Sequence, residues 1–166
     1  MKRKSLYYLV LTALLAALTA ALTTAPHLLN LPNGGYVHLG DLFVFLAGCL
    51  LPTPYAMAAA AIGGGLGDLF SGAAQFAPAT ILIKAAIAAL FSANRDKLLT
   101  GRNALMTLPA AAITMGGYLL YEGIAIGWHV ALTNLPFNLL QAASSAALFF
   151  VAAAAMDKTG LKRKIQ

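Results

Sequence analysis

Charged residues are scarce in this chain of 166 residues. Lysine and arginine supply 11 and aspartate and glutamate five, so charged residues make up 10% of the chain and hydrophobic residues 60%. A soluble domain carries about 25% charged residues, so the composition excludes an ordinary soluble fold. It indicates an all-α integral membrane protein, and we expect a single domain over residues 1–166.

Cysteine occurs once, as Cys49 within an apolar run, which excludes an intrachain disulfide and a cysteine-based metal site. The chain also lacks a nucleotide-binding loop, a Cys/His metal pattern and a phosphatidyl-transferase motif. We therefore expect no catalytic residue, no metal and no cofactor. Any ATP-driven transport needs a motor on another chain.

Six apolar segments are candidates to cross a bilayer, for which a helix needs roughly 20 residues. The second and third are short and separated by Pro52 and Pro54, which break a helix. The first is longer than a signal-peptide core and is followed by Pro26, which should hinder cleavage, so we expect it to be retained. The predicted spans cover residues 6–25, 39–51, 55–70, 78–92, 105–121 and 131–156.

Basic residues mark one side of the predicted membrane domain. All except Lys84 lie in the two terminal tails or in the loop after the fourth span. Because positively charged loops stay in the cytoplasm, six spans place both termini there, in a prokaryotic plasma membrane. The net charge of +6 therefore reports topology within the lipid bilayer and not binding of nucleic acid.

Ionisable residues away from that side gather near the outer ends of the predicted spans. An ionised side chain at the bilayer centre costs about 2.5–3.5 kcal/mol, so such residues normally line a cavity or pair with one another. Two alternatives stay open: Asp41 caps the second helix, and Lys84 either pairs with Asp68 or Glu122 or extends to the membrane surface. The gathered residues are His38, Asp41, Asp68, Lys84, Glu122 and His129.

The last predicted span carries a polar stripe. Asn134, Asn138, Gln141 and Ser145 recur at helical spacing on one face. The two asparagines lie near the ionisable group and favour a pocket wall, whereas we expect the two deeper residues to contact another helix. Trp128 precedes the stripe and offers an aromatic surface for stacking.

A stripe of small residues runs along the first predicted span. Ala13, Ala17 and Ala21 follow an Ala-xxx-Ala-xxx-Ala spacing, and small residues let another helix approach closely in a membrane. The stripe either packs inside the protein or receives a partner.

The tetrapeptide Gly-Asp-Leu-Phe occurs twice, at 40–43 and 67–70, and its second copy completes the Gly-x-Gly-Asp signature of intramembrane aspartyl proteases. Two carboxylates that share a proton can perform hydrolysis. Prepilin peptidases, which use this motif, work at the cytoplasmic face, whereas both aspartates here map to the outer side. A protease is therefore disfavoured, and the clustered polar residues disfavour a scaffold without a ligand.

Four motifs together carry a resemblance to a known family: Gly40-Asp41, Gly67-Asp68, Ala77-Pro78-x-Thr80 with Lys84, and Pro136-x-Asn138-x-x-Gln141. The chain resembles, over essentially its whole length, the S component of energy-coupling factor (ECF) vitamin transporters, in the branch with riboflavin-, hydroxymethylpyrimidine- and pyridoxine-type members. S components are the substrate-binding membrane subunits of these ABC importers.

The resemblance implies how the parts work. The vitamin would bind near the outer surface under a lid formed by the stretch from His27 to Asp41, and toppling of the protein would release it inside. Ala13, Ala17 and Ala21 would dock an EcfT-type transmembrane coupling subunit, and two cytoplasmic ATPases would supply the energy. The candidate substrate-binding residues are His38, Asp41, Asp68, Lys84, Glu122, Trp128, His129, Asn134 and Asn138.

The charge of the candidate pocket bears on the vitamin. Asp41, Asp68 and Glu122 against Lys84 leave about −2 with neutral histidines, and a desolvated charge must be matched for binding. We therefore favour a pyridoxine-like vitamin or hydroxymethylpyrimidine. If Asp41 caps a helix and Asp68 pairs with Lys84, a neutral flavin such as riboflavin is the alternative.

Overall fold

The computed structural model of the protein describes residues 2–24, 29–30, 36–94, 96–160 and 162. Nearly all of them are helical, which confirms the all-α class. Two short strands, β1 (Leu29–Asn30) and β2 (Tyr36–Val37), pair antiparallel. The helices are α1 (Lys2–Thr24), α2 (Asp41–Leu50), α3 (Thr53–Phe70), the 3-10 turn η1 (Ala74–Phe76), α4 (Ala77–Leu90), α5 (Gly101–Leu105), α6 (Thr107–Ala125) and α7 (Trp128–Thr159).

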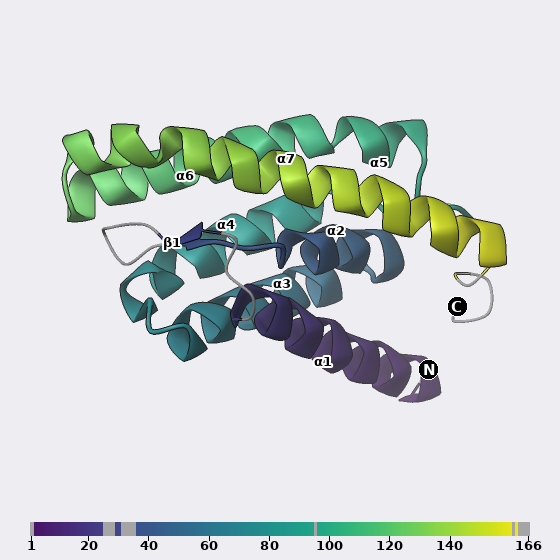
Figure 1. Ribbon diagram of the computed structural model, residues 1–166. Helices are drawn as coiled ribbons and strands as arrows, with labels where there is room; N and C mark the ends of the chain where they lie inside the picture. The colour runs from purple at the N-terminus through teal and green to yellow at the C-terminus, as the bar shows by residue number, and fades with distance from the viewer. Residues whose placement is uncertain (1, 25–28, 31–35, 95, 161, 163–166) are drawn as a thin grey trace.

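The helices form a bundle with α2 at its centre. Helices α6 and α7 pack together along one face, α1 and α3 along the opposite face, and α2 contacts α1, α3, α4 and α7. The start of α1, the end of α7 and α5 lie at one end of the bundle, which we call the inner end (Figure 1). The β1–β2 hairpin and the α6–α7 junction lie toward the other, outer end.

The outward surface of the bundle is apolar, as the composition predicts. Large side chains such as Leu82, Ile124 and Val151 are 72%, 81% and 70% exposed, whereas soluble monomers rarely expose extended apolar patches. Three helical stretches are long and apolar enough to cross a membrane: Lys4–Thr24, Gly101–Ala125 and Trp128–Thr159. The protein is therefore a helical membrane protein, and the count of six spans stays a prediction.

The predicted spans correspond to six observed helices, with one difference in length. Helix α3 has 18 residues, so the prediction of a short third helix is wrong: Pro54 lies in its first turn, where a missing N–H removes no helical hydrogen bond. Helix α2 is short, as predicted, with 10 residues. At about 1.5 Å per residue it covers roughly half of the hydrocarbon core.

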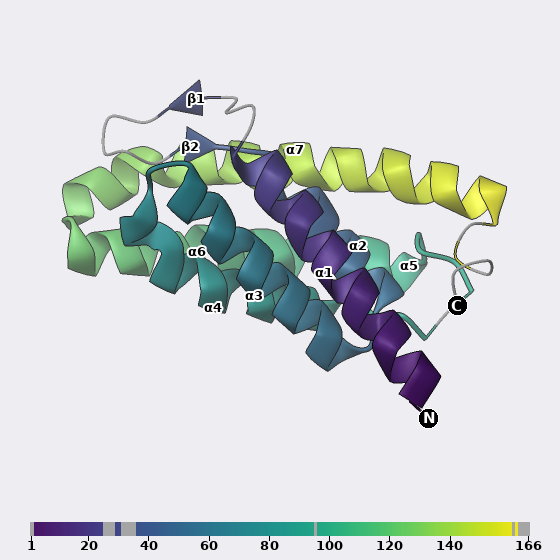
Figure 2. The same cartoon turned by 90° about the horizontal axis from the view of Figure 1, so that it is seen from below.

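Glycines on α3 allow close packing against α1. Added Cβ atoms at Gly63 and Gly67 would lie 2.6 Å from the carbonyl oxygen of Ala16 and 2.4 Å from Cγ2 of Thr23. Figure 2 shows the two helices side by side over most of α3. Any larger side chain at these glycines would push the helices apart.

The apolar core lies toward the inner half of the bundle. Phe45 of α2 stacks on Phe91 with ring centroids 5.0 Å apart, and Phe149 of α7 meets both rings edge-on. Cys49 is buried and free. This packing fixes α2 against α7 and leaves the amino end of α2 to the polar site.

Candidate functional site

The amino end of α2 lies inside the bundle. Figure 1 shows the stretch between β2 and α2 passing between the longer helices, so that α2 begins deeper than its neighbours. Gly40 is the N-cap residue, and no side chain caps the helix. The alternative that Asp41 acts as a helix cap is therefore wrong, and its carboxylate, 1% exposed, has another role.

Asp41 forms a buried ion pair with Lys84 of α4. The Oδ1–Nζ distance is 2.6 Å and both side chains are 1% exposed. The alternatives that Lys84 pairs with Asp68 or Glu122, or extends to the membrane surface, are therefore wrong. The ammonium group also lies 5.5 Å from the ring centroid of Tyr118, within the range of a cation–π interaction. Such a pair is tolerated in an apolar interior because each charge neutralises the other.

Gln141 of α7 connects this ion pair to the backbone before α2. Its Nε2 donates to Oδ2 of Asp41 at 3.4 Å, and its Oε1 accepts from the backbone N–H of His38 at 3.4 Å. His38 is buried as well, and its Nδ1 accepts from the N–H of Gly40 at 3.0 Å. The expectation that Gln141 contacts another helix is confirmed, but sequence reasoning left it out of the candidate site.

Asp68 near the end of α3 accepts a hydrogen bond from Tyr36 of β2, with 2.8 Å between the oxygens. Burial, and then the charge of Asp68, raise the pKa of the Tyr36 phenol above its ordinary value, so the hydroxyl stays protonated and acts as the donor. Next to this contact, Thr80 of α4 and Tyr118 of α6 share a hydrogen bond of 2.8 Å. Sequence reasoning did not assign Tyr36 this contact.

Glu122 and Asn134 meet where α6 and α7 pack. Nδ2 of Asn134 donates to Oε2 of Glu122 at 3.1 Å, and both residues are buried. One helical turn further along α7, Nδ2 of Asn138 is buried without a hydrogen-bond partner among the described residues, as is Oδ2 of Asp68. A buried polar atom left unbonded costs about 1–3 kcal/mol, so these two atoms are suited to a polar ligand.

The other predicted site residues lie outside this buried cluster. Trp128 is 54% exposed and His129 is exposed, both at the first turn of α7. The indole of Trp128 covers Gly123, where an added Cβ would lie 2.6 Å from the ring. His27, the start of the predicted lid, lies outside the described residues.

The alanine stripe of α1 faces outward. Ala13, Ala17 and Ala21 are exposed, whereas Leu15 and Ala16 of the same helix are buried. The alternative of internal packing is therefore wrong for these three alanines. A shallow apolar groove of about 450 Å³ adjoins the stripe, lined by Ala17, Ala20, Ala21, Thr24, Leu66 and Phe70.

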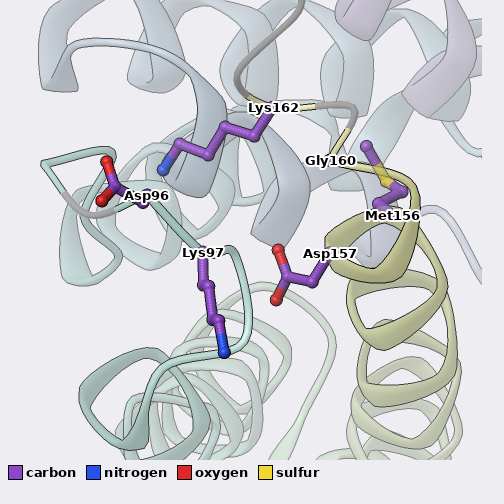
Figure 3. A pocket seen from close by; sticks show the side chains of 6 residues that line it. All are labelled: Asp96, Lys97, Met156, Asp157, Gly160 and Lys162. Atoms are coloured by element: carbon purple, nitrogen blue, oxygen red, sulfur yellow. The ribbon is translucent and has the colours of Figure 1, made fainter.

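A second polar cluster, not predicted from the sequence, lies at the inner end. Asp157 accepts from the backbone N–H groups of Leu98 and Leu99 at 2.7 and 2.9 Å, and Nζ of Lys162 donates to the carbonyl of Ala93 at 3.0 Å. These side chains line a cavity of about 290 Å³ together with Asp96 and Lys97 of the loop after α4. Figure 3 shows Lys162 extending toward Asp96, and Asp157 on α7. These contacts tie the loop after α4 to the end of α7.

Within the described ranges, no three His, Cys, Asp or Glu side chains are grouped so that they could hold a metal ion. The buried polar groups at the outer end are carboxylate, amide, hydroxyl, imidazole and ammonium groups. This set favours recognition of an organic ligand by hydrogen bonds.

The profile of the family described as "ECF-type riboflavin transporter, S component" matches residues 3–158. The chain belongs to this family. No curated protein matches the chain. Membership confirms the resemblance found in the sequence and makes the protein a vitamin-capturing transporter subunit, not an enzyme, so the protease and scaffold alternatives are wrong. It also implies that this S component works with an ECF module.

Proposed function

We propose that this S component captures riboflavin at the outer end of its bundle, in a prokaryotic plasma membrane that it crosses with six spans and both termini in the cytoplasm. The observation that carries the proposal is the buried polar cluster beneath β2, in a chain with only five acidic residues. Lys84, Asp41, Asp68 and Glu122 are each at most 4% exposed. Burying so many ionisable groups is costly, and a ligand site gives a reason for it.

The contacts among these groups reduce the negative charge that the site offers to a ligand. Asp41 is neutralised by Lys84, and Asp68 and Glu122 accept hydrogen bonds from Tyr36 and Asn134. The ligand therefore need not be a cation. A neutral flavin carries adjacent N–H and C=O groups, which suit the acceptor Oδ2 of Asp68 and the donor Nδ2 of Asn138. The family description also points to riboflavin.

A pyridoxine-like vitamin or hydroxymethylpyrimidine is the second candidate. The observation in its favour is that Asp68 and Glu122 receive hydrogen bonds from neutral donors, so a protonated or amine-bearing ring would add the attraction of opposite charge. These vitamins are smaller than riboflavin and would leave more of the site to water.

Among the candidate residues, we assign direct contact with the vitamin to Glu122, Asn134, Asn138 and the free oxygen of Asp68. Asp41 and Lys84 hold the floor of the site through their ion pair, and His38 holds its lid side. Trp128 and His129, exposed at the outer end of α7, would form the rim.

The test is a binding titration of the full chain purified in detergent. Riboflavin fluorescence and, separately, Trp128 fluorescence are followed with riboflavin, pyridoxine, pyridoxamine, hydroxymethylpyrimidine, thiamine and folate, with thermal shift as a third readout. We expect saturable binding of riboflavin alone, weakened at least tenfold in Glu122→Gln and unchanged in the control Asn94→Ala, an exposed residue of the inner loop. Binding of a pyridoxine-type compound instead would favour the second candidate. No binding of any of the six would reject both.

The outward alanine face of α1 is proposed as the docking surface for the EcfT-type coupling subunit, which acts with two cytoplasmic ATPases. The larger side chain in Ala17→Leu would keep a helix of the coupling subunit from approaching α1 as closely as small residues permit. We expect Ala17→Leu to reduce co-purification with the ECF module several-fold and leave vitamin binding unchanged. Ala112→Leu, at an exposed alanine of α6, is the matched control. Equal co-purification of both variants would exclude this surface.

A further inference from the structure

The strand β2 is fastened to the bundle by two helices on different sides. Oη of Tyr36 donates to Asp68 of α3, and the N–H of His38, directly after β2, donates to Gln141 of α7. Both acceptor residues are buried, at 4% and 3% exposed. The segment 36–40 is therefore held by side chains of the bundle at two points.

Gln141 makes a second contact, toward the ion pair. While its Oε1 accepts from the lid backbone, its Nε2 donates to the carboxylate of Asp41, which is paired with Lys84. A primary amide is the side-chain group that offers an acceptor and a donor on adjacent atoms. A carboxylate, a thioether or an aliphatic group at this position would lose at least one of the two bonds.

We infer that Gln141 is a positioning residue that couples closure of the segment 36–40 to the Asp41–Lys84 ion pair. With β2 in place, the amide is oriented by the N–H of His38 and donates to Asp41. When β2 lifts, the amide loses its orienting partner and Asp41 loses a donor. Opening therefore weakens both contacts together, and the buried pair stabilises the closed segment through Gln141.

This coupling sets how long a ligand beneath β2 is retained, a consequence that rests on the proposed function. Gln141 lies under the lid and beside the ion pair, so its substitution should act on dissociation of the vitamin more than on association. The coupling between lid and ion pair is a property of the protein without ligand and can be measured without one.

The first test is hydrogen exchange of the ligand-free chain in detergent, read by mass spectrometry over residues 36–40. Loss of a hydrogen bond with a net value of about 1 kcal/mol corresponds to roughly fivefold faster exchange, which we expect in Gln141→Met, a change of similar length. Ser145→Ala is the matched control: it lies one turn deeper on the same face, and its Oγ has no hydrogen-bond partner among the described residues. Unchanged exchange in Gln141→Met with exchange elsewhere preserved would overturn the inference.

A double-variant cycle tests the coupling itself. Asp41→Leu/Lys84→Met removes both charges at once, so neither is left alone in the interior. We expect faster exchange over residues 36–40 in this variant and a further increase of less than fivefold when Gln141→Met is added, because an amide without Asp41 is already less well oriented toward the N–H of His38. Additive effects would show that the lid and the ion pair are independent. Should Gln141→Met fail to fold, Gln141→Asn, which keeps the amide but shortens its reach, takes its place.

The second test adds riboflavin. We expect Gln141→Met to raise its dissociation rate by a similar factor of about five, with the association rate changed less than twofold. An unchanged dissociation rate beside faster exchange would remove the role in retention and keep the coupling. If wild-type protein binds no riboflavin, the proposed vitamin fails, and the exchange data alone decide the inference.

Discussion

At the inner end of the bundle, buried polar side chains bond to the backbone, whereas at the outer end they bond mainly to one another. Asn103 donates to the carbonyls of Ser92 and Leu98, and Asp157 accepts two backbone N–H groups. Asp41, Lys84 and Asp68 meet side chains instead. The inner contacts therefore hold the backbone of the loop after α4 in place.

The two ends also differ in how completely their polar atoms are satisfied. Within the described part of the chain, the buried side-chain atoms without a hydrogen-bond partner belong to Thr23, Asp41, Asp68, Lys84, Asn138 and Ser145, and none belongs to the inner cluster. The Asp41 and Lys84 atoms meet as an ion pair. A cluster in which every buried polar atom has a hydrogen-bond partner stabilises the fold, whereas buried donors and acceptors without a partner are suited to binding a ligand. We therefore expect the inner cluster to contribute to stability and the outer cluster to ligand binding, and variants at each end can test this.

Breaking the outer ion pair should have the largest effect. Lys84→Met leaves the carboxylate of Asp41 buried without its cation, which costs about 3–5 kcal/mol. We expect a large loss of thermal stability in detergent, together with loss of vitamin binding. The double variant Asp41→Leu/Lys84→Met should recover most of the stability and none of the binding.

Lys158→Met, at an exposed lysine near the end of α7, is the control for that experiment and should leave the unfolding midpoint unchanged. A single Lys84→Met variant as stable as wild type would show that the pair contributes nothing, and the contrast between the two ends would lose its strongest case.

The inner cluster should affect stability alone. Asp157→Ala removes two charge-assisted hydrogen bonds to the backbone of Leu98 and Leu99. At about 1.5–3 kcal/mol for a bond to a charged group, and with some compensation by water, we expect a loss of about 2–3 kcal/mol. The measurements are thermal unfolding and vitamin affinity. A fall in affinity with unchanged unfolding would reverse the assignment of the inner end.

Asn138 should give the opposite result. Because its Nδ2 bonds to none of the described groups, Asn138→Ala removes no hydrogen bond from the ligand-free protein. We expect the unfolding free energy to stay the same or to rise, by at most the roughly 1–3 kcal/mol that a buried unbonded group costs, while vitamin affinity falls roughly tenfold as one ligand hydrogen bond is lost. A variant that binds normally would remove Asn138 from the site.

The sequence predicted the outer cluster but not its pairing. Asp41, Asp68 and Lys84 stand out because charges are rare in apolar helices, and that rarity is visible in composition alone. Which carboxylate pairs with Lys84 depends on how deep in the bundle the first residue of α2 lies. Its start inside the bundle follows from how the chain enters after β2, which no local pattern records. A helix cap at Asp41 and the pairing of Lys84 with Asp68 or Glu122 were therefore alternatives that the sequence left open, and the structure excludes them.

The inner cluster could not be predicted from the sequence, because polar residues are common at the membrane surface where it lies. Asn103, Asp157 and Lys162 lie in segments where polar residues are expected at a membrane surface. Their contacts join positions up to 69 residues apart, and backbone acceptors and donors carry no mark in the sequence. Helix periodicity, by contrast, is local, and it predicted the positions of Asn134 and Asn138 on one face of α7.

Lys162 should show the smallest effect, and it depends on pH. The residue is 2% exposed and bonds to the carbonyl of Ala93. Burial lowers the pKa of its ammonium group, against the opposing effects of Cys49, Asp157 and Asp96. The folded state therefore binds this proton less tightly than the unfolded chain does. The free energy of unfolding should rise as the pH increases toward 10.5, the ordinary pKa of lysine. Lys162→Met should abolish that rise and change stability at pH 7 by less than about 1 kcal/mol. Thermal unfolding from pH 7 to pH 10 measures both, and an unchanged pH profile in the variant would assign the rise to other groups and leave Lys162 as a hydrogen-bond donor only.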